Sequence, residues 1–419
     1  MNFQPPSKSL TPRDRLFIAL VGLLIIIASV GLYSVNRSLP NGGGEFLRHW
    51  VGARSFAFER SDPYSAHVPD TAQKLVYGRM AVSGEEPYIL DTPFHLLLLY
   101  FPFSLLADPQ TARAIYTVIL EWALFALVYL SLRLTEWTAP RWFSILFFLA
   151  ASFNFYTYQS ILEASPILLL GLLYAGILLA LRNEQDELTG ALLALSLYFW
   201  EAGLPLLVLV IWYCYKRGYT RVFAGFGMLS FILLVISFLL YPGWLIPYLR
   251  AGMNNLRADY GFTIISAFTK LFPAYGIYLG WGILILLIFA LGYEWNTVQR
   301  ADQRRFYWVA CLSIAAAPLL GFRTEMDNLS VLIIPLAFFF SVVYDRWRSI
   351  ANFLIFILLM LIFLVPWTLY LFIPPQFELI SQNALFLFFP LFTVLGLYWI
   401  RWWAIRPPRV WADAVTRNL

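Results

Sequence analysis

Charged residues are scarce in this sequence. Asp, Glu, Lys and Arg make up only 13% of its 419 residues, whereas a typical soluble domain contains about 25%. Hydrophobic residues account for 60% of the chain, and the mean hydropathy is +0.70. This balance excludes a water-soluble enzyme, and it also excludes a disordered chain, because disorder requires low hydrophobicity.

Cysteine and histidine are scarcer still, with two and three residues respectively. Cys214 and Cys311 both lie inside apolar runs, where a small buried hydrophobic residue is a simpler interpretation than a disulfide or a metal ligand. The formal charge of +5 does not indicate nucleic-acid binding, because the basic residues are scattered between apolar runs instead of forming a basic domain.

Long apolar runs make up most of the chain. A run such as 222–241 can cross a bilayer as a helix, whereas the strands of a membrane barrel would alternate over about ten residues. We therefore expect 1–419 to form a single all-α polytopic membrane domain of about 12 transmembrane helices. The expected spans are 16–34, 112–132, 141–158, 165–182, 188–200, 203–215, 222–241, 276–294, 306–321, 329–343, 350–373 and 384–400.

The connections between these runs alternate in charge. One set is rich in Arg and Lys, whereas the short loops 159–164, 201–202 and 374–383 contain neither. Because cytoplasmic loops collect Lys and Arg, we expect the basic set inside the cell. Both termini, including the tail 401–419, are then cytoplasmic, and the chain is expected in the plasma membrane.

Two irregular segments accompany the spans. The segment 94–107 is short and contains Pro102, and apolar stretches of about 10–14 residues are more often re-entrant or interfacial than spanning. Around Glu201 the runs are also short. There, Gly203 and Pro205 are expected to break the helix and leave Glu201 at the floor of an outward-facing cavity.

The segment 35–93 is the longest one expected outside the membrane. Residues 45–59 have apolar side chains at helical spacing and are expected to form a helix in the membrane interface. A turn is expected at 62–65, followed by a short helix over 70–79 with Asp70 as its N-cap.

Glu45 is the leading candidate for chemistry. It follows Gly42, Gly43 and Gly44, whose lack of side chains allows the backbone to turn and approach other groups closely. An acid that favours the helix N-terminus is the alternative interpretation. The candidate substrate-binding residues expected on the same face are His49, Asp91, His95, Gln159, Glu201, Arg250, Arg257, Arg323 and Asp327.

Simpler interpretations exist for several of these residues. Arg323 and Asp327 could form an ion pair at a helix end. Arg250 and Arg257 could extend toward lipid headgroups, as long basic side chains near a membrane often do.

The stretch GEFLRHWVGARSFAFERSDPYS, residues 44–65, resembles the start of glycosyltransferase family 87. These enzymes are polyprenol-phosphate-mannose-dependent membrane mannosyltransferases of the GT-C superfamily. The matching steps are Glu45-Phe46, His49-Trp50, Ala53-Arg54 and Asp62-Pro63-Tyr64, with weaker likeness at Pro93, Pro102, Tyr158-Gln159 and 323–328. Three positions differ from the family pattern: Glu45 stands in place of Asp, His49 in place of Tyr, and Glu201 in place of Lys.

The resemblance implies a GT-C-like fold and an inverting transfer of a sugar, expected to be mannose. The sugar would move from a polyprenyl-phosphate donor to a hydroxyl of a glycan, glycolipid or other acceptor on the outer face. Glu45 would accept the proton of that hydroxyl, and Arg323 with Arg257 or Arg250 would bind the phosphate. The remaining roles are sugar binding by Asp91, Gln159 and Glu201, and a donor or acceptor contact by His49.

This scheme needs no metal or other cofactor. Even so, Glu45, His49, Asp91, His95 and Glu201 could together form an oxygen–nitrogen metal site. Two other functions stay open. One is a transporter or flippase for a lipid-linked or small polar solute, since buried charges and broken helices occur in transporters. The other is a catalytically inactive relative that binds lipid-linked sugar.

Overall fold

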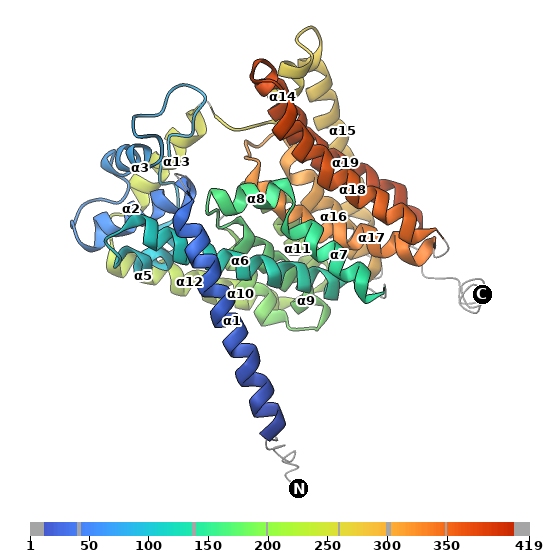
Figure 1. The fold of residues 1–419 in the computed structure, drawn as a ribbon, viewed down its shortest axis with the longest axis horizontal. Coiled ribbons are helices and arrows are strands. Elements are labelled where there is room, and N and C mark those ends of the chain that lie inside the picture. The colour runs from blue at the N-terminus through green and yellow to red at the C-terminus, as the bar shows by residue number, and fades with distance from the viewer. Residues whose placement is uncertain are drawn as a thin grey trace.

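The computed structural model describes residues 12–39, 43–135, 140–197, 200–258, 260–298, 303–347 and 350–405. Their secondary structure is helical, and the extended pairing found among them is one bridge between Phe262 and Thr324 (Figure 1). The predicted all-α class is therefore confirmed for this part of the chain. The predicted cytoplasmic tail, apart from 401–405, lies outside the described residues.

Each of the expected spans overlaps at least one helix. The elements are α1 Pro12–Ser38, α2 Gly44–Ala57, α3 His67–Tyr77, α4 Phe94–Leu97, η1 Leu98–Tyr100, α5 Phe101–Ser104, α6 Pro109–Leu134, α7 Arg141–Ser152, α8 Phe155–Leu162, α9 Ile167–Arg182, α10 Asp186–Ser196, α11 Trp200–Arg217, α12 Thr220–Leu240, α13 Leu245–Arg257, α14 Ile264–Leu271, α15 Gly276–Val298, α16 Gln303–Ala316, η3 Ala317–Leu319, η4 Asp327–Leu332, α17 Ile333–Arg346, α18 Ala351–Phe372, η5 Pro375–Phe377 and α19 Glu378–Ala404.

Seven helices in the described residues are long and apolar enough to cross a membrane, or eight if the bent pair α7–α8 counts as one span. The other expected spans correspond to α9, α10, α11 and α16, which have 16, 11, 18 and 14 residues. A helix of 14 residues reaches about 21 Å, which is short of the roughly 30 Å of a hydrocarbon core. The chain is thus a helical membrane protein with several spans, and the total of 12 stays a prediction.

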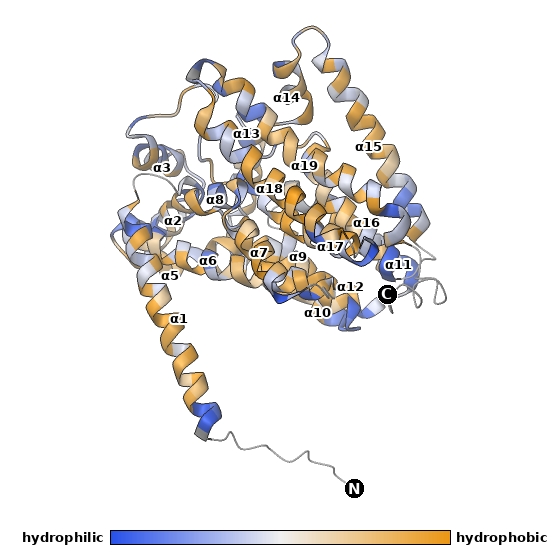
Figure 2. Cartoon of the chain, turned by 45° about the vertical axis from the view of Figure 1, so that its right-hand side comes forward, coloured by the Kyte–Doolittle hydropathy of each residue, from blue (hydrophilic) through white to orange (hydrophobic). Residues whose placement is uncertain are grey.

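Helix α1 stands apart from the rest of the protein. It projects from the helical body along most of its length, and its surface is apolar except near its start (Figures 1 and 2). The most apolar 18 residues of α1 have no residue buried inside the protein. Its end is held to α6, where Asn36 donates to a carboxylate oxygen of Glu121 at 3.1 Å and Arg113 donates to the Leu39 carbonyl at 2.9 Å. Lipid can therefore surround most of α1 while its end remains fixed to the body.

The segment 94–107 does not form a long helix. It is divided into α4, η1 and α5, and together these cover only Phe94–Ser104. Trp50 of α2 donates its indole N–H to the Phe103 carbonyl at 3.0 Å, and Arg54 donates to the Ser104 carbonyl at 3.1 Å. The segment is therefore short and packs against α2, and its re-entrant or interfacial position stays a prediction.

Helix α2 confirms the helix expected over 45–59, and its position relative to the membrane interface stays a prediction, but it does not present an open apolar face to lipid. Phe46, His49 and Ala53 are fully buried, and both Glu45 and Arg48 are 6% exposed. Polar and apolar faces of α2 alike are therefore covered by protein. The reason is that segments 78–93 and 94–104 pack around it, which the helical spacing of its own residues could not reveal.

The region after α2 matches the prediction in part. Asp62 makes the expected turn, because its carboxylate accepts the Tyr64 N–H at 2.9 Å. The following helix, α3, begins at His67 instead of residue 70. Asp70 thus lies in the first turn of α3, where a carboxylate is favoured by the helix dipole, and it is not the N-cap.

The break expected at Gly203 and Pro205 is also wrong. Helix α11 begins at Trp200 and continues through both residues to Arg217. A side chain at Gly203 would place its Cβ 1.4 Å from the Tyr174 hydroxyl, so glycine allows α11 to pack closely against α9. Glycine here serves helix packing, and Pro205 lies in the second turn of the helix, near its start.

Candidate active site

Two glycines position the start of α2. Gly43 has φ of 81°, which is a left-handed conformation that favours glycine. A Cβ at Gly44 would lie 2.1 Å from the ring of Tyr88, so no larger residue fits without moving that ring. The Gly44 N–H also lies close enough to the Glu163 carboxyl group to oppose the rise of its pKa. The predicted role of the glycines is confirmed for Gly43 and Gly44, whereas Gly42 lies outside the described residues.

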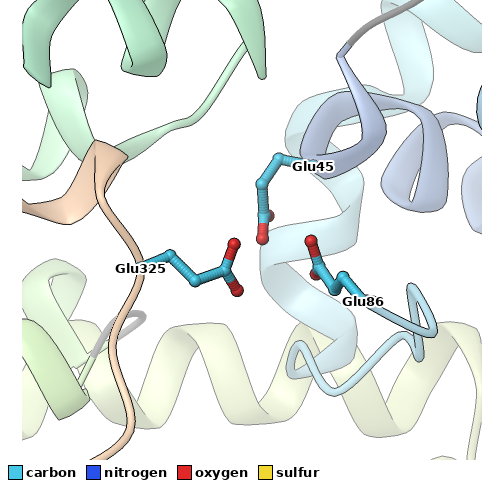
Figure 3. Close-up of side chains that lie close together, drawn as sticks. All are labelled: Glu45, Glu86 and Glu325. Carbon is cyan, nitrogen blue, oxygen red and sulfur yellow. The ribbon is translucent and has the colours of Figure 1, made fainter. Parts of the chain in front are cut away.

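Three glutamates from distant parts of the chain meet beside the start of α2. Glu45 belongs to α2, Glu86 to the connection after α3, and Glu325 to the loop before η4. Each has a carboxylate oxygen within 4.8 Å of the others. In Figure 3 the three side chains point toward one another. We call these three residues the glutamate cluster.

Arg48 is the cation in contact with this cluster. Its guanidinium lies 2.8 Å from Glu45, 3.3 Å from Glu86 and 3.8 Å from Asp91, measured between nitrogen and carboxylate oxygen. The Arg48 side chain is 7% exposed, and those of Glu45 and Glu86 are 8% and 9% exposed. One buried guanidinium therefore faces at least three carboxylates that are largely shielded from water.

Burial changes the protonation of these acids. It raises the pKa of Glu45 to about 7, with Arg48 opposing the rise and Asp327 adding to it. Burial also raises the pKa values of Glu86 and Glu325 well above their ordinary range. Glu163 follows the same pattern, with a pKa raised to about 7 by burial. Burial therefore favours the neutral form of these carboxyl groups, and the pKa of Glu45 lies near neutral pH.

Arg323 lies near this cluster but its guanidinium is directed to α13. It donates to the carbonyls of Asn255 at 2.8 Å and Ala258 at 2.9 Å, and to the Tyr260 hydroxyl at 3.1 Å, and it stacks over the Tyr260 ring. The expectation that the loop 322–328 meets Glu45 is confirmed through Glu325. The predicted phosphate contact of Arg323 stays a prediction, because the guanidinium here closes the end of α13.

A chain of hydrogen bonds connects Arg323 to the cluster. The Tyr260 hydroxyl donates to the Asn255 side-chain oxygen at 2.7 Å, and the Asn255 amide donates to Asp91 at 2.6 Å. Asp91 in turn faces Arg48. The predicted site residue Asp91 thus lies between α13 and the glutamate cluster.

His49 is held by the protein on both ring nitrogens. Nδ1 lies 2.6 Å from the Glu45 carbonyl, and Nε2 lies 2.7 Å from the Thr92 hydroxyl. A carbonyl can only accept, so Nδ1 carries the hydrogen and Nε2 accepts from Thr92. Burial lowers the pKa of His49 well below its ordinary value, so the ring is neutral. The predicted substrate contact would require one of these bonds to open.

Three further predicted residues are Asp327, Gln159 and His95. Asp327 lies close enough to raise the pKa of Glu45, and its carbonyl accepts the Ser160 hydroxyl at 2.8 Å. Gln159 is half-buried on α8, one residue from Ser160. His95 instead faces α12 and the turn after it, 3.3 Å from the Ser237 hydroxyl and edge-on to Trp244.

Of the remaining predicted residues, Arg250 and Arg257 have no ion pair with the cluster among the described residues. Arg250 and Arg257 are exposed on α13. Glu201 lies in α11, but its side chain is outside the described residues, and so is the expected cavity floor. A small apolar pocket of about 20 Å³ lies elsewhere, between α7, α8, α17, α18 and α19. Phe147, Leu359 and Phe389 are among the residues lining it.

Several residues of the site were not among the predicted site residues. Arg48 and Glu325 belong to the segments that carry the family likeness, and Glu163 lies on the predicted outer face. The predicted topology therefore placed all three on the same side as the site. Glu86 lies in an irregular connection without periodicity, and no sequence signal marks it. Glu86 becomes recognisable only when the segments are packed together.

The metal-ligand set also differs from the one expected. Among the described residues, the acids close enough to share a cation are Glu45, Glu86 and Glu325. Carboxylate oxygens at this spacing are the ligands that hard divalent cations prefer. The expected histidine ligands are not part of this group, because His49 binds Thr92 and His95 lies beside Ser237.

The fold and these contacts define a helical membrane protein with a buried acid-rich site beside α2. No protein-family model and no curated protein sequence matches this chain. The resemblance to the polyprenyl-phosphate-dependent transferases therefore enters the proposal below as an expectation from the residues alone.

The stability of the protein should depend on pH through these buried acids. A carboxyl group whose pKa is raised by folding binds more protons in the folded state, so the free energy of unfolding falls as pH rises between the two pKa values. We expect the thermal unfolding midpoint in detergent to fall from about pH 6.5 to about pH 8.5. The lowered pKa of His49 makes the free energy of unfolding rise with pH, but only below the ordinary histidine pKa of 6.5. Glu325→Gln should flatten the dependence, and a midpoint that rises over this interval would contradict the assignment.

Replacing Arg48 should be strongly destabilising. In Arg48→Gln the buried acids lose their cation, and removal of one partner from a buried ion pair typically costs about 3–5 kcal/mol. We expect a lower unfolding midpoint, with a larger loss at pH 8 than at pH 6.5 because more of the acids are then ionised. Arg79→Gln is the matched control, since Arg79 pairs with Glu85 at the surface and its loss should have little effect. Equal stability of the two variants would refute the central role of Arg48.

Proposed function

We propose that this chain is a membrane glycosyltransferase that moves a sugar, expected to be mannose, from a polyprenyl-phosphate donor to an acceptor hydroxyl. The observation that carries the proposal is the position of Glu45, a buried carboxylate at the start of α2 that meets acids from two distant segments. In this proposal the site faces the outside of the plasma membrane and both termini are cytoplasmic, as the distribution of basic loops supports.

The protonation state of Glu45 supports its role as the general base. A base works best when its pKa lies near the operating pH, and burial raises the pKa of Glu45 to about 7. As the acceptor oxygen bonds to the sugar carbon, the hydroxyl proton would pass to Glu45. The bond between that carbon and the phosphate oxygen would break, and the phosphate would leave with the electron pair.

The other two acids suit the leaving side of the reaction. Burial raises the pKa values of Glu86 and Glu325 and so favours their protonated form, in which each can donate a hydrogen bond to a sugar hydroxyl or a phosphate oxygen. Neutral carboxyl groups also reduce the repulsion that an anionic phosphate would meet at an acid-rich site. This supports a reaction without a metal ion, in which Arg323 would approach the phosphate by leaving the end of α13.

The assignment of the base predicts the behaviour of Glu45→Gln. Loss of a general base typically costs a factor of 10² to 10⁴, so we expect transfer to fall at least about 100-fold. The measurement is sugar transfer or donor cleavage by the purified protein with a panel of polyprenyl-phosphate sugars. The unfolding midpoint at pH 8 should be unchanged or higher, because the variant removes a carboxylate from a crowded cluster.

The matched control is Glu59→Gln, at an exposed acid beside the end of α2 that accepts a hydrogen bond from Ser55. This variant should keep full transfer activity. Full activity of Glu45→Gln would remove the base assignment. Donor binding without cleavage by the wild-type protein would instead identify a catalytically inactive lipid-sugar-binding relative.

Independence from metal ions is a separate prediction. We expect transfer by the wild-type protein to be unchanged after treatment with EDTA and to gain nothing from added Mg²⁺ or Mn²⁺. The physical reason is that burial favours protonated carboxyl groups and that Arg48 already supplies a positive charge to the glutamate cluster. EDTA could instead abolish transfer, and an added divalent cation could then restore it in the wild-type protein but not in Glu325→Gln. That result would show that the cluster binds a metal ion.

A further inference from the structure

Helix α13 has an exposed apolar stripe. At 100° per residue, the side chains of this stripe fall within about 100° of arc on one side of the helix. Its members are Leu245, Ile246, Leu249, Met253 and Leu256, with exposed fractions of 39%, 69%, 52%, 54% and 65%. An apolar face of this size facing water would be unfavourable, so the stripe requires a cover.

The opposite side of α13 is fixed to the protein. Ala251 is 5% exposed and Asn255 is 6% exposed. The Asn255 amide donates to Asp91, and the Arg323 guanidinium caps the Asn255 and Ala258 carbonyls. The exposed stripe therefore belongs to a helix whose inner face is already in place.

The position of α13 in the chain indicates that lipid covers the stripe. It follows the candidate span α12 after a turn of only four residues, 241–244. The last residues of that span, Leu239 and Leu240, are 76% and 50% exposed. The apolar surface of the span thus continues in sequence into the stripe, which begins at Leu245.

Two arginines border one edge of the stripe. Arg250 and Arg257 are seven residues apart, so they lie on the same flank of the helix at a separation of about 10 Å along its axis. Both side chains are exposed. A helix with an apolar face and basic residues beside it is typical of segments that lie in the interface of an anionic membrane.

We propose that α13 lies in the membrane–water interface, with its apolar stripe in the lipid and with Arg250 and Arg257 on the phosphates of anionic headgroups. This gives these two arginines a lipid-binding role that does not depend on sugar transfer. Because Asn255 holds Asp91 from the other side of the same helix, the membrane surface also sets the position of Asp91 beside Arg48.

Spin labels can test this placement. The natural cysteines Cys214 and Cys311 are both buried, so a nitroxide reagent should react with a single introduced cysteine. We would compare Met253→Cys, in the stripe, with Asn254→Cys, an adjacent exposed position outside it. In nanodiscs holding one protein each, the label at 253 should be accessible to oxygen and shielded from a water-soluble nickel complex. The label at 254 should be accessible to nickel.

A second measurement tests the arginines. Detergent-purified protein is titrated with a fluorescent phosphatidylglycerol and, in parallel, with the corresponding phosphatidylcholine. The combined variant Arg250→Gln with Arg257→Gln should lose affinity for phosphatidylglycerol by about fivefold for each arginine, with little change for phosphatidylcholine. Arg79→Gln is the control, because Arg79 is an exposed arginine on another segment and should have no effect.

Each unfavourable result has a clear meaning. Equal nickel access at 253 and 254 would place the stripe in water and overturn the proposal. Shielding of the label at 253 from both reagents would show that a partner protein covers the stripe. Unchanged phosphatidylglycerol affinity in the combined variant would overturn the headgroup contact. None of these results depends on whether the protein transfers sugar.

Discussion

The contact of one buried guanidinium with several buried acids is the constraint on which the rest of the site depends. Arg48 reaches Glu45, Glu86 and Asp91, and these three residues come from α2 and from the connection that follows α3. A buried ion pair is stable only if its geometry is good and its remaining polar atoms find partners. This requirement is met only in part. Gly44 allows Tyr88 to pack against the start of α2, but the Arg48 Nε is buried without a hydrogen-bond partner among the described residues.

One cation cannot neutralise all of these acids, and the excess charge has a chemical consequence. Carboxylates this close and this well shielded cannot all be ionised, so some take up protons or a cation enters. Raised pKa values at Glu45, Glu86 and Glu325 favour protons. The result is a mixture of proton acceptors and proton donors in one place, which is what acid–base catalysis at neutral pH requires.

The sequence predicts local structure well where one strong signal acts alone. Apolar runs define the long helices, and the turn at Asp62 follows from its own side chain. Prediction fails where packing decides. Gly203 looks like a helix breaker, yet it lies inside α11 because Tyr174 packs against it. Helix α2 is amphipathic like an interfacial helix, yet other segments cover both of its faces.

The same distinction applies to the site. Placing the segments of Glu45 and the loop 322–328 on one face of the membrane predicts that they meet, and they do so through Glu325. The topology cannot say which side chain of that loop points inward. Arg323 has the chemistry of a phosphate ligand, but it caps α13, because helix carbonyls compete for the same guanidinium donors. Glu86 lies in a connection without periodicity, so only the folded structure reveals it.

Helix α13 connects the site to the membrane. Its inner face holds Asp91 through Asn255, and the other end of the same hydrogen-bond chain is Arg323, two residues before Glu325. A movement of α13 would therefore act on both sides of the glutamate cluster, through Asp91 and Arg48 on one side and through the loop of Glu325 on the other. In the proposed function, an amphiphilic donor would bring its polar head to the depth of this cluster while its chain stayed in lipid. A helix fixed at the interface by its apolar stripe gives the cluster a constant depth relative to the bilayer. In this proposal, the hydrogen bonds between α13 and the site fix the position of the site relative to the membrane surface.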